Sequence, residues 1–295
     1  MKRLAVWGAA AVLALLGVAG GRGQAAAPRE LPVVVVDAPL AGTWLRQNGT
    51  PHVSISAEAL PSRTFSGPGV MVLPLESIRS HEAVGAVERY VRQGGRVVAT
   101  YWGTLAGPES DLHPVYDLCE LLGVRPAGWR YDEEAELEIR SRGVGALPRP
   151  GAKLRLSDCM QVVAEPIGST LVAARWTKAD GASAAPSAPA AAFVNGRVFY
   201  FTSNLFRPDG DTSAEREAFF WALQRIAPDL GVRVQARDRL YTASAAVRRL
   251  EAGGATPEAR AARAVVDDAR QAFAAKDHAQ AIRLADRAAE MADLK

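Results

Sequence analysis

The sequence has few of the side chains that most often carry covalent or metal chemistry. Its 295 residues include only two cysteines, Cys119 and Cys159, and four histidines. The histidines lie far apart in the chain, and none has the spacing to another that is typical of zinc ligands. We therefore expect no metal site and no bound cofactor. The histidines are His52, His81, His113 and His278.

Runs of like charge are also missing. Lys and Arg number 35 against 32 Asp and Glu, and the basic residues are scattered rather than clustered. Proteins that bind nucleic acids usually gather their basic residues on one face or along one helix. We therefore expect no nucleic-acid partner.

Long apolar runs are confined to the N-terminus. Lys2 and Arg3 precede "LAVWGAAAVLALLGVAG", and small residues follow. This order is typical of an export signal, so we expect cleavage after Ala25 and a periplasmic or extracellular protein with no membrane contact after cleavage. The alternative is an uncleaved anchor, because the run is only slightly shorter than the ~20 residues that a spanning helix needs.

Export would place both cysteines in an oxidising compartment, where Cys119 and Cys159 could form a disulfide. The alternative is that Cys119 lies on the apolar face of the helix predicted for "HPVYDLCELLGV", beside Leu118 and Leu122, and is simply a core residue. The sequence leaves both interpretations open.

Short β-branched runs predict a parallel sheet. Residues 33–36 are four consecutive valines, and further apolar runs cover 70–73 and 96–100. Such unbroken runs are typical of strands buried on both faces. Between the last two runs a helix is predicted that begins after Ser80, whose hydroxyl can cap it, and ends near Gly94. Strand, helix and strand at these lengths favour a crossover between parallel strands.

The pattern changes at about residue 130. Apolar and charged residues alternate in "AELEIRS", which predicts a half-exposed strand with its glutamates in solvent. Asn195 and Gly196 predict a hairpin turn, because both accept positive φ. We therefore expect a β-rich insert over about 130–200.

Two helical regions follow the insert. A helix is predicted near 212–226, where Thr212 and Glu215 could form a capping box. The segment 240–295 is rich in alanine and predicts an α-helical hairpin, which should pack on the preceding domain or on a partner.

Three stretches together resemble a known family. They are "GVMVLPLESIRSHEAVGAVERYVRQGGRVVATYWGTLAG", "DLCELLGV" and "FVNGRVFYFTSNL". They are similar to the class I glutamine-amidotransferase-like domain, in particular to the trimerisation, or middle, domain of family 42 beta-galactosidases. The resemblance covers about 32–228 and implies an α/β fold, a flavodoxin-like three-layer parallel sheet. We thus expect a signal peptide at 1–25, this domain with its β-rich insert at 30–235, and the helical hairpin at 240–295.

The resemblance also bears on catalysis. Active amidotransferases carry a cysteine nucleophile in the turn after one strand and a His-x-Glu pair further on. The matching turn here holds Thr100, Tyr101 and Trp102, and no His-x-Glu follows it. Because acyl transfer needs an activated nucleophile with a base in reach, we expect no catalytic residue of this family's kind. In the middle-domain relatives the turn also lacks a nucleophile, and the domain assists oligomer assembly or shapes a neighbouring sugar site.

Aromatic residues are the best candidates for a binding site. Aromatic rings stack on the C–H faces of sugars, and Tyr101 and Trp102 follow a predicted strand at the edge where open α/β sheets bind ligands. The same residues could instead fill the core. The candidates for ligand or interface contact are Thr100, Tyr101, Trp102 and Trp44, and the other aromatic residues of interest are Trp129, Tyr131 and Trp176.

We therefore expect an exported, non-catalytic binding or assembly module, which the family resemblance alone links to carbohydrate. Two alternatives stay open. One is a glycoside hydrolase or accessory subunit that uses carboxylates which the sequence does not pair. The other is a periplasmic scaffold whose hairpin at 240–295 binds a partner protein.

Overall fold

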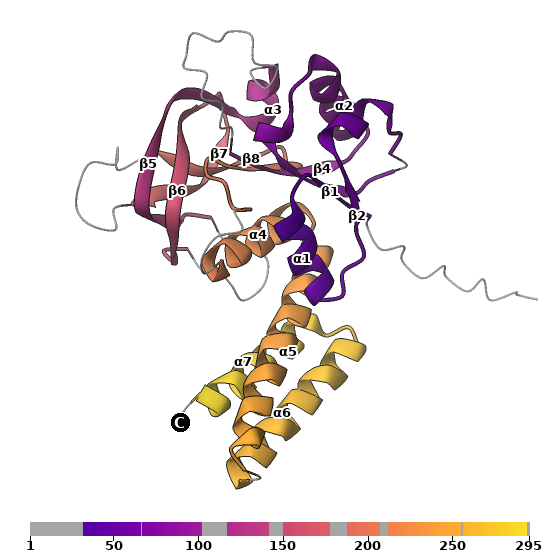
Figure 1. Cartoon of the computed structure of the whole chain (residues 1–295), viewed down its shortest axis with the longest axis vertical. Helices are drawn as coiled ribbons and strands as arrows, with labels where there is room; N and C mark the ends of the chain where they lie inside the picture. The colour runs from indigo at the N-terminus through magenta and orange to yellow at the C-terminus, as the bar shows by residue number, and fades with distance from the viewer. Residues whose placement is uncertain are drawn as a thin grey trace, which may run out of the picture. The chain divides into compact units, whose positions relative to one another are not determined.

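A single mixed sheet organises the chain in the computed structural model (Figure 1). The structure describes residues 32–65, 67–101, 117–141, 150–177, 188–206, 212–254 and 256–293. Within these residues nine strands pair in the order β2-β1-β3-β4-β9-β8-β7-β5-β6. The sheet and its helices fall within one compact unit, Leu31–Lys295.

The first half of the sheet is parallel, as the valine-rich runs predict. Its strands are β1 (Val33–Val36), β2 (Val53–Ile55), β3 (Val70–Pro74), β4 (Arg96–Thr100) and β9 (Val198–Phe201). The four valines of β1 alternate between two core clusters: Val33 and Val35 belong to one, Val34 and Val36 to the other. An unbroken apolar run is required because both faces of the strand are covered.

Helices cover both faces of this parallel half. The face of Val33 packs against α1 (Pro39–Gln47) and α4 (Ser213–Ile226). The face of Val34 packs against η1 (Ala57–Ser62), η2 (Leu75–Ser77), α2 (His81–Arg92) and α3 (Cys119–Leu122). The chain is therefore a mixed α/β protein.

The local signals around α2 are confirmed. Ser80 caps the helix by accepting a hydrogen bond from the Ala83 N–H at 3.2 Å. Gly94 has φ of 95°, a left-handed conformation that lets the chain leave the helix directly into β4. The predicted capping box of α4 is wrong, since the Thr212 hydroxyl makes no cap hydrogen bond. The φ and ψ of Thr212, −102° and 21°, differ from the extended geometry that aims such a side chain at the helix.

The second half of the sheet is antiparallel and begins somewhat before residue 130. Its strands are β5 (Val124–Ile139), β6 (Lys153–Pro166), β7 (Leu171–Thr177) and β8 (Pro189–Val194). Asn195 and Gly196 form the predicted turn between β8 and β9, with φ of 49° and 70°. The sheet curls back on itself, so that the outermost strand, β6, lies next to the residues that follow β9. An isolated antiparallel bridge joins Gln161 in the middle of β6 to Ser203.

Three helices complete the described chain: α5 (Pro228–Ala252), α6 (Pro257–Ala274) and α7 (His278–Asp293). The predicted hairpin corresponds to α6 and α7. The expected boundary near 235–240 lies inside α5, which continues unbroken and packs on α4 at one end and on both later helices at the other. None of the described helices is long and apolar enough to cross a membrane. The expected signal peptide at 1–25 lies outside the described residues.

Candidate functional site

The turn after β4 adopts an unusual backbone conformation. Tyr101 has φ of 39°, a left-handed value that is uncommon for a residue with a side chain and that costs free energy. Its N–H donates to the Phe201 carbonyl at 2.9 Å, which holds the turn against the end of β9. The Tyr101 ring is largely buried, and its hydroxyl donates to the Met160 sulfur at 3.7 Å. This turn therefore directs a tyrosine side chain toward β6.

Thr100, which precedes the turn, is fully buried in β4, between Pro74 of β3 and Phe201 of β9. Its hydroxyl has no hydrogen-bond partner among the described residues. The structure thus places Thr100 within the sheet, away from any exposed ligand surface. Trp102 lies outside the described residues.

The two cysteines are free thiols, so the disulfide that the sequence left open is not formed. Cys159 belongs to the core cluster on the α4 face, whereas Cys119 packs against the cluster on the α2 face. Burial raises the pKa of the Cys159 thiol to about 12, and it also raises the pKa of Cys119. Both side chains are therefore protonated at neutral pH and are poor nucleophiles.

Trp44 is a core residue, and its candidacy for ligand contact is wrong. Only 4% of the residue is exposed, and its ring lies 6.0 Å from Phe206 and 5.8 Å from Phe219. Trp44 lies on the buried side of α1, and the facing side of α4 presents Phe219 to it. Sequence alone does not distinguish this packing from exposure, because the same tryptophan would suit either.

An exposed aromatic surface lies beside the turn. Trp129 and Tyr131 on β5 are 54% and 51% exposed. They are two residues apart on one strand, so their side chains project from the same face about 7 Å apart. On β6, Met160 pairs with Tyr131 and accepts the hydrogen bond of Tyr101. We call the exposed rings of Trp129 and Tyr131, together with Met160 beside them, the aromatic face.

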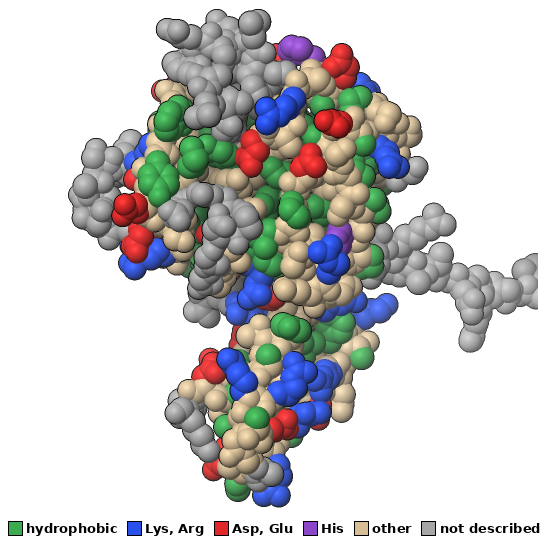
Figure 2. All heavy atoms as spheres, viewed as in Figure 1, with side chains coloured by type: hydrophobic (Ala, Val, Ile, Leu, Met, Phe, Trp, Pro, Cys, Tyr) green, Lys and Arg blue, Asp and Glu red, His purple; other side chains and the backbone are tan. Residues whose placement is uncertain are grey.

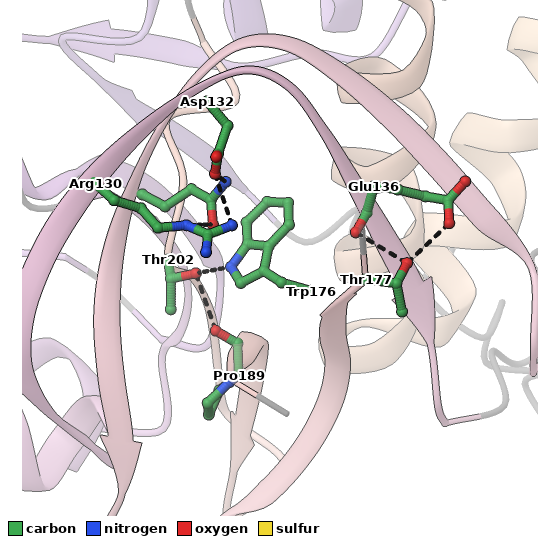
Figure 3. Close-up of polar contacts among 8 residues, drawn as sticks. Arg130, Asp132, Glu136, Trp176, Thr177, Pro189 and Thr202 are labelled. Atoms are coloured by element: carbon green, nitrogen blue, oxygen red, sulfur yellow. Dashed lines mark hydrogen bonds and ion pairs between the residues drawn. The ribbon is translucent and has the colours of Figure 1, made fainter. Parts of the chain in front are cut away.

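A polar network holds the adjacent side chains of the β5–β6 hairpin. Arg130 forms an ion pair with Asp132 at 2.6 Å, and the Gln161 amide donates to Asp132 at 2.7 Å (Figure 3). Arg130 also donates to the Gln161 oxygen at 3.3 Å. Because Arg130 and Asp132 alternate with Trp129 and Tyr131 along β5, the network fixes the strand without occupying the aromatic face.

A second set of contacts anchors the hairpin to the end of β9. The Trp176 indole donates to the Thr202 hydroxyl at 3.0 Å, and that hydroxyl donates to the Pro189 carbonyl at 3.1 Å (Figure 3). The Val162 N–H donates to the Thr202 carbonyl at 2.7 Å. Trp176 is therefore a structural residue. It joins β7 to β9 and helps hold β6 next to the turn at Tyr101.

Two glutamates near the end of β5 are paired with cations. Glu136 contacts Lys153 at 2.6 Å and accepts a hydrogen bond from Thr177 at 2.8 Å. The hydrogen bond from Lys153 is the main cause that lowers the pKa of Glu136. Glu138 lies 3.2 Å from Arg140. These two side chains are only 14% and 19% exposed, so they are engaged by cations on a half-buried strand face, whereas the alternating pattern predicts glutamates in solvent.

Polar side chains at the carboxyl ends of β1 and β3 serve loop structure. Asp37, with φ of 44°, accepts a hydrogen bond from the Ala57 N–H at 2.8 Å and so positions η1. Asn204, just after β9, donates to Glu76 at 2.9 Å and accepts from the Phe206 N–H at 2.8 Å. The aromatic face is thus the main described surface near this edge that leaves large side chains open to solvent.

Comparison with known proteins finds little. No protein-family model and no curated protein matches the chain. A solved structure titled mmIFT52 N-terminal domain is similar over 65% of this chain and 96% of its own length, at 12% identity and a TM-score of 0.39. A likeness this weak leaves the function to be argued from the residues of the chain itself.

Proposed function

We propose that the protein is an exported, non-catalytic binding module that holds a carbohydrate on its aromatic face. The observation that carries the proposal is the side-by-side exposure of Trp129 and Tyr131 on one face of β5. Contiguous exposed apolar surface often marks an interaction site, and these two rings lie next to each other on one strand. Flat rings in a row suit the C–H faces of sugar rings.

The proposed fold family is the amidotransferase-like domain with a flavodoxin-like sheet. Its parallel strands follow the order β2-β1-β3-β4-β9, which corresponds to the order 2-1-3-4-5 of that fold once β5 to β8 are treated as an insert. The left-handed turn at Tyr101 supports the same proposal, because it stands where the family's nucleophile would stand. The tyrosine there makes an internal contact with Met160, so the position holds a packed side chain where the family has its nucleophile.

The first test is a titration of oligosaccharides from several glycan classes into the chain that begins at Ala26, followed by calorimetry and thermal shift. A ligand that binds only the folded state must raise the melting temperature. Trp129→Ala and Tyr131→Ala should each weaken binding about tenfold or more, because covering one exposed ring is worth about 1–2 kcal/mol. The melting temperature without sugar should change little.

The matched control is Tyr241→Ala on α5, because Tyr241 is 52% exposed and lies on another element. That variant should bind sugar like the wild type. If no glycan class binds well-folded protein, or if all three variants lose binding equally, the proposal is wrong. Turnover of fluorogenic glycosides that disappears on Glu136→Gln would instead favour the hydrolase.

A further inference from the structure

Near its C-terminal end, the exposed side of α5 carries a shallow, wide-open strip of surface, which we call the groove. It is formed by Tyr241, Thr242, Ala245 and Ala252 together with two arginines, all from this one helix. Tyr241 supplies an exposed ring, while the two alanines keep the helix surface low enough for another chain to approach. The groove is therefore apolar along its length and basic at one side.

The two arginines, Arg248 and Arg249, have no ion-pair partner within the described part of the chain. Both side chains are exposed. Some arginines of α4 and α5 are paired: Arg239 contacts Asp286, and Arg216 contacts Asp238. Two exposed guanidinium groups beside a tyrosine make a surface suited to carboxylates.

A small cavity of about 120 Å³ adjoins the groove and shares Arg248 with it. It lies between α5 and α6 and is also lined by Arg263 and Arg270. Asp267 contacts both of these last two arginines, at 3.5 Å and 2.7 Å, and Glu251 contacts Arg263 at 3.5 Å. Positive charge exceeds negative charge around the cavity. Figure 2 shows Lys and Arg side chains, with Asp and Glu side chains among them, over the helical part of the molecule.

We propose that this face of α5 binds an acidic peptide segment of another protein. An apolar side chain of the peptide would pack on Tyr241 and Ala245, and its carboxylates would pair with Arg248 and Arg249. A further carboxylate could enter the adjoining cavity at Arg248. The argument for this occupant is charge complementarity: the groove joins apolar surface to cations that no described carboxylate neutralises. The site is separate from the aromatic face and does not depend on sugar binding.

The test is fluorescence anisotropy with a fluorescein-labelled peptide of four Glu-Glu-Leu repeats. It should bind saturably, and a matched Lys-Lys-Leu peptide should not. Affinity should fall several-fold as salt rises from about 0.05 M to about 0.3 M, because exposed charges are screened. Arg248→Glu combined with Arg249→Glu should weaken binding at least about tenfold, since like charges would then face the peptide. Tyr241→Ser should weaken it while leaving the net charge unchanged.

The control is Arg283→Glu combined with Arg287→Glu on α7, which changes the net charge equally and lies outside the groove. It should bind the acidic peptide like the wild type. Circular dichroism checks folding, and Arg248→Gln with Arg249→Gln replaces the first variant if that variant unfolds. Equal loss in the α5 and α7 variants would overturn the proposal. So would absence of acidic-peptide binding, or Arg248- and Arg249-dependent binding to phosphatidylserine vesicles in its place.

Discussion

At the scale of single residues, burial decides which side chains can take part in chemistry. Cys159 and Thr100 lie close to the end of the parallel strands, yet one is a protonated thiol in the core and the other a hydroxyl enclosed by neighbouring strands. The exposed residues nearby are Trp129 and Tyr131. Their rings provide apolar contact surface and no nucleophile. The site is therefore built for contact.

The thiol of Cys159 should make stability depend on pH in alkaline solution. Its pKa is raised to about 12 in the folded state, above its value of about 8.5–9 in an unfolded chain. The unfolded state therefore loses this proton first, and stability is lost as pH rises from about 9 toward about 12, by up to about 1.4 kcal/mol per pH unit.

Urea unfolding at pH 7.5 and pH 10 measures this effect. The wild type should lose more stability between the two values than Cys159→Ala does, since Tyr90 and other groups with raised pKa are common to both. The same loss in both proteins would show that the thiol is not buried as described.

At the scale of elements, one glycine occurs inside a helix, where helix propensity disfavours it. The close approach of two helices explains its presence. Gly231 lies inside α5, where glycine normally costs about 1 kcal/mol relative to alanine. A Cβ at this position would lie 2.4 Å from the Gln224 backbone of α4. The missing side chain therefore lets α4 and α5 cross closely, beside the buried hydrogen bond from Gln224 to Gln235.

Two helical glycines should thus respond to alanine with opposite signs. Gly231→Ala should destabilise the protein by about 2 kcal/mol or more, because the clash is with backbone that cannot move aside cheaply. Gly85→Ala in α2 should stabilise it by about 0.5–1 kcal/mol, because its Cβ would meet only the flexible end of Arg89. Melting temperatures of the two variants test whether the stability changes have opposite signs. If Gly231→Ala is as stable as the wild type, α4 and α5 cross less closely than described.

Signals between neighbouring residues predicted many of the strands, helix caps and turns. The features that the sequence did not predict depend on contacts between residues far apart in the chain. The valines of β1, the Ser80 cap and the Asn195 turn depend on neighbours in the chain, so the sequence shows them. The burial of Trp44 depends on α4, which lies more than 160 residues later. The bridge from Gln161 to Ser203, which brings the aromatic face to the turn, likewise has no local signature.

At the scale of the whole molecule, stability should be uneven. The largest core cluster joins both halves of the sheet to α4, with Val35, Leu137 and Leu223 among its members. The buried residues between α5, α6 and α7 are mostly alanines. Alanine buries little area, so less hydrophobic free energy holds these helices than holds the sheet.

Native-state hydrogen exchange followed by mass spectrometry should show this difference. Amides of α6 and α7 should exchange through local opening well before those of β1, β3 and β9. The first part of α5 should follow the sheet, because Leu230 and Val234 belong to the sheet's core cluster. Equal protection throughout would mean that the helices and the sheet unfold as one cooperative unit.

The pairing of β6 with the residues just after β9 affects the tendency of the protein to aggregate. An open sheet exposes unpaired backbone groups along two outer strands, and these are the usual starting points for aggregation. On one side here the outermost strand, β2, is only three residues long. On the other side, the bridge between Gln161 and Ser203 interrupts the outer row of β6. The longest continuous edge left for another polypeptide is therefore the first part of β6, before Gln161, rather than the whole length of an outer strand.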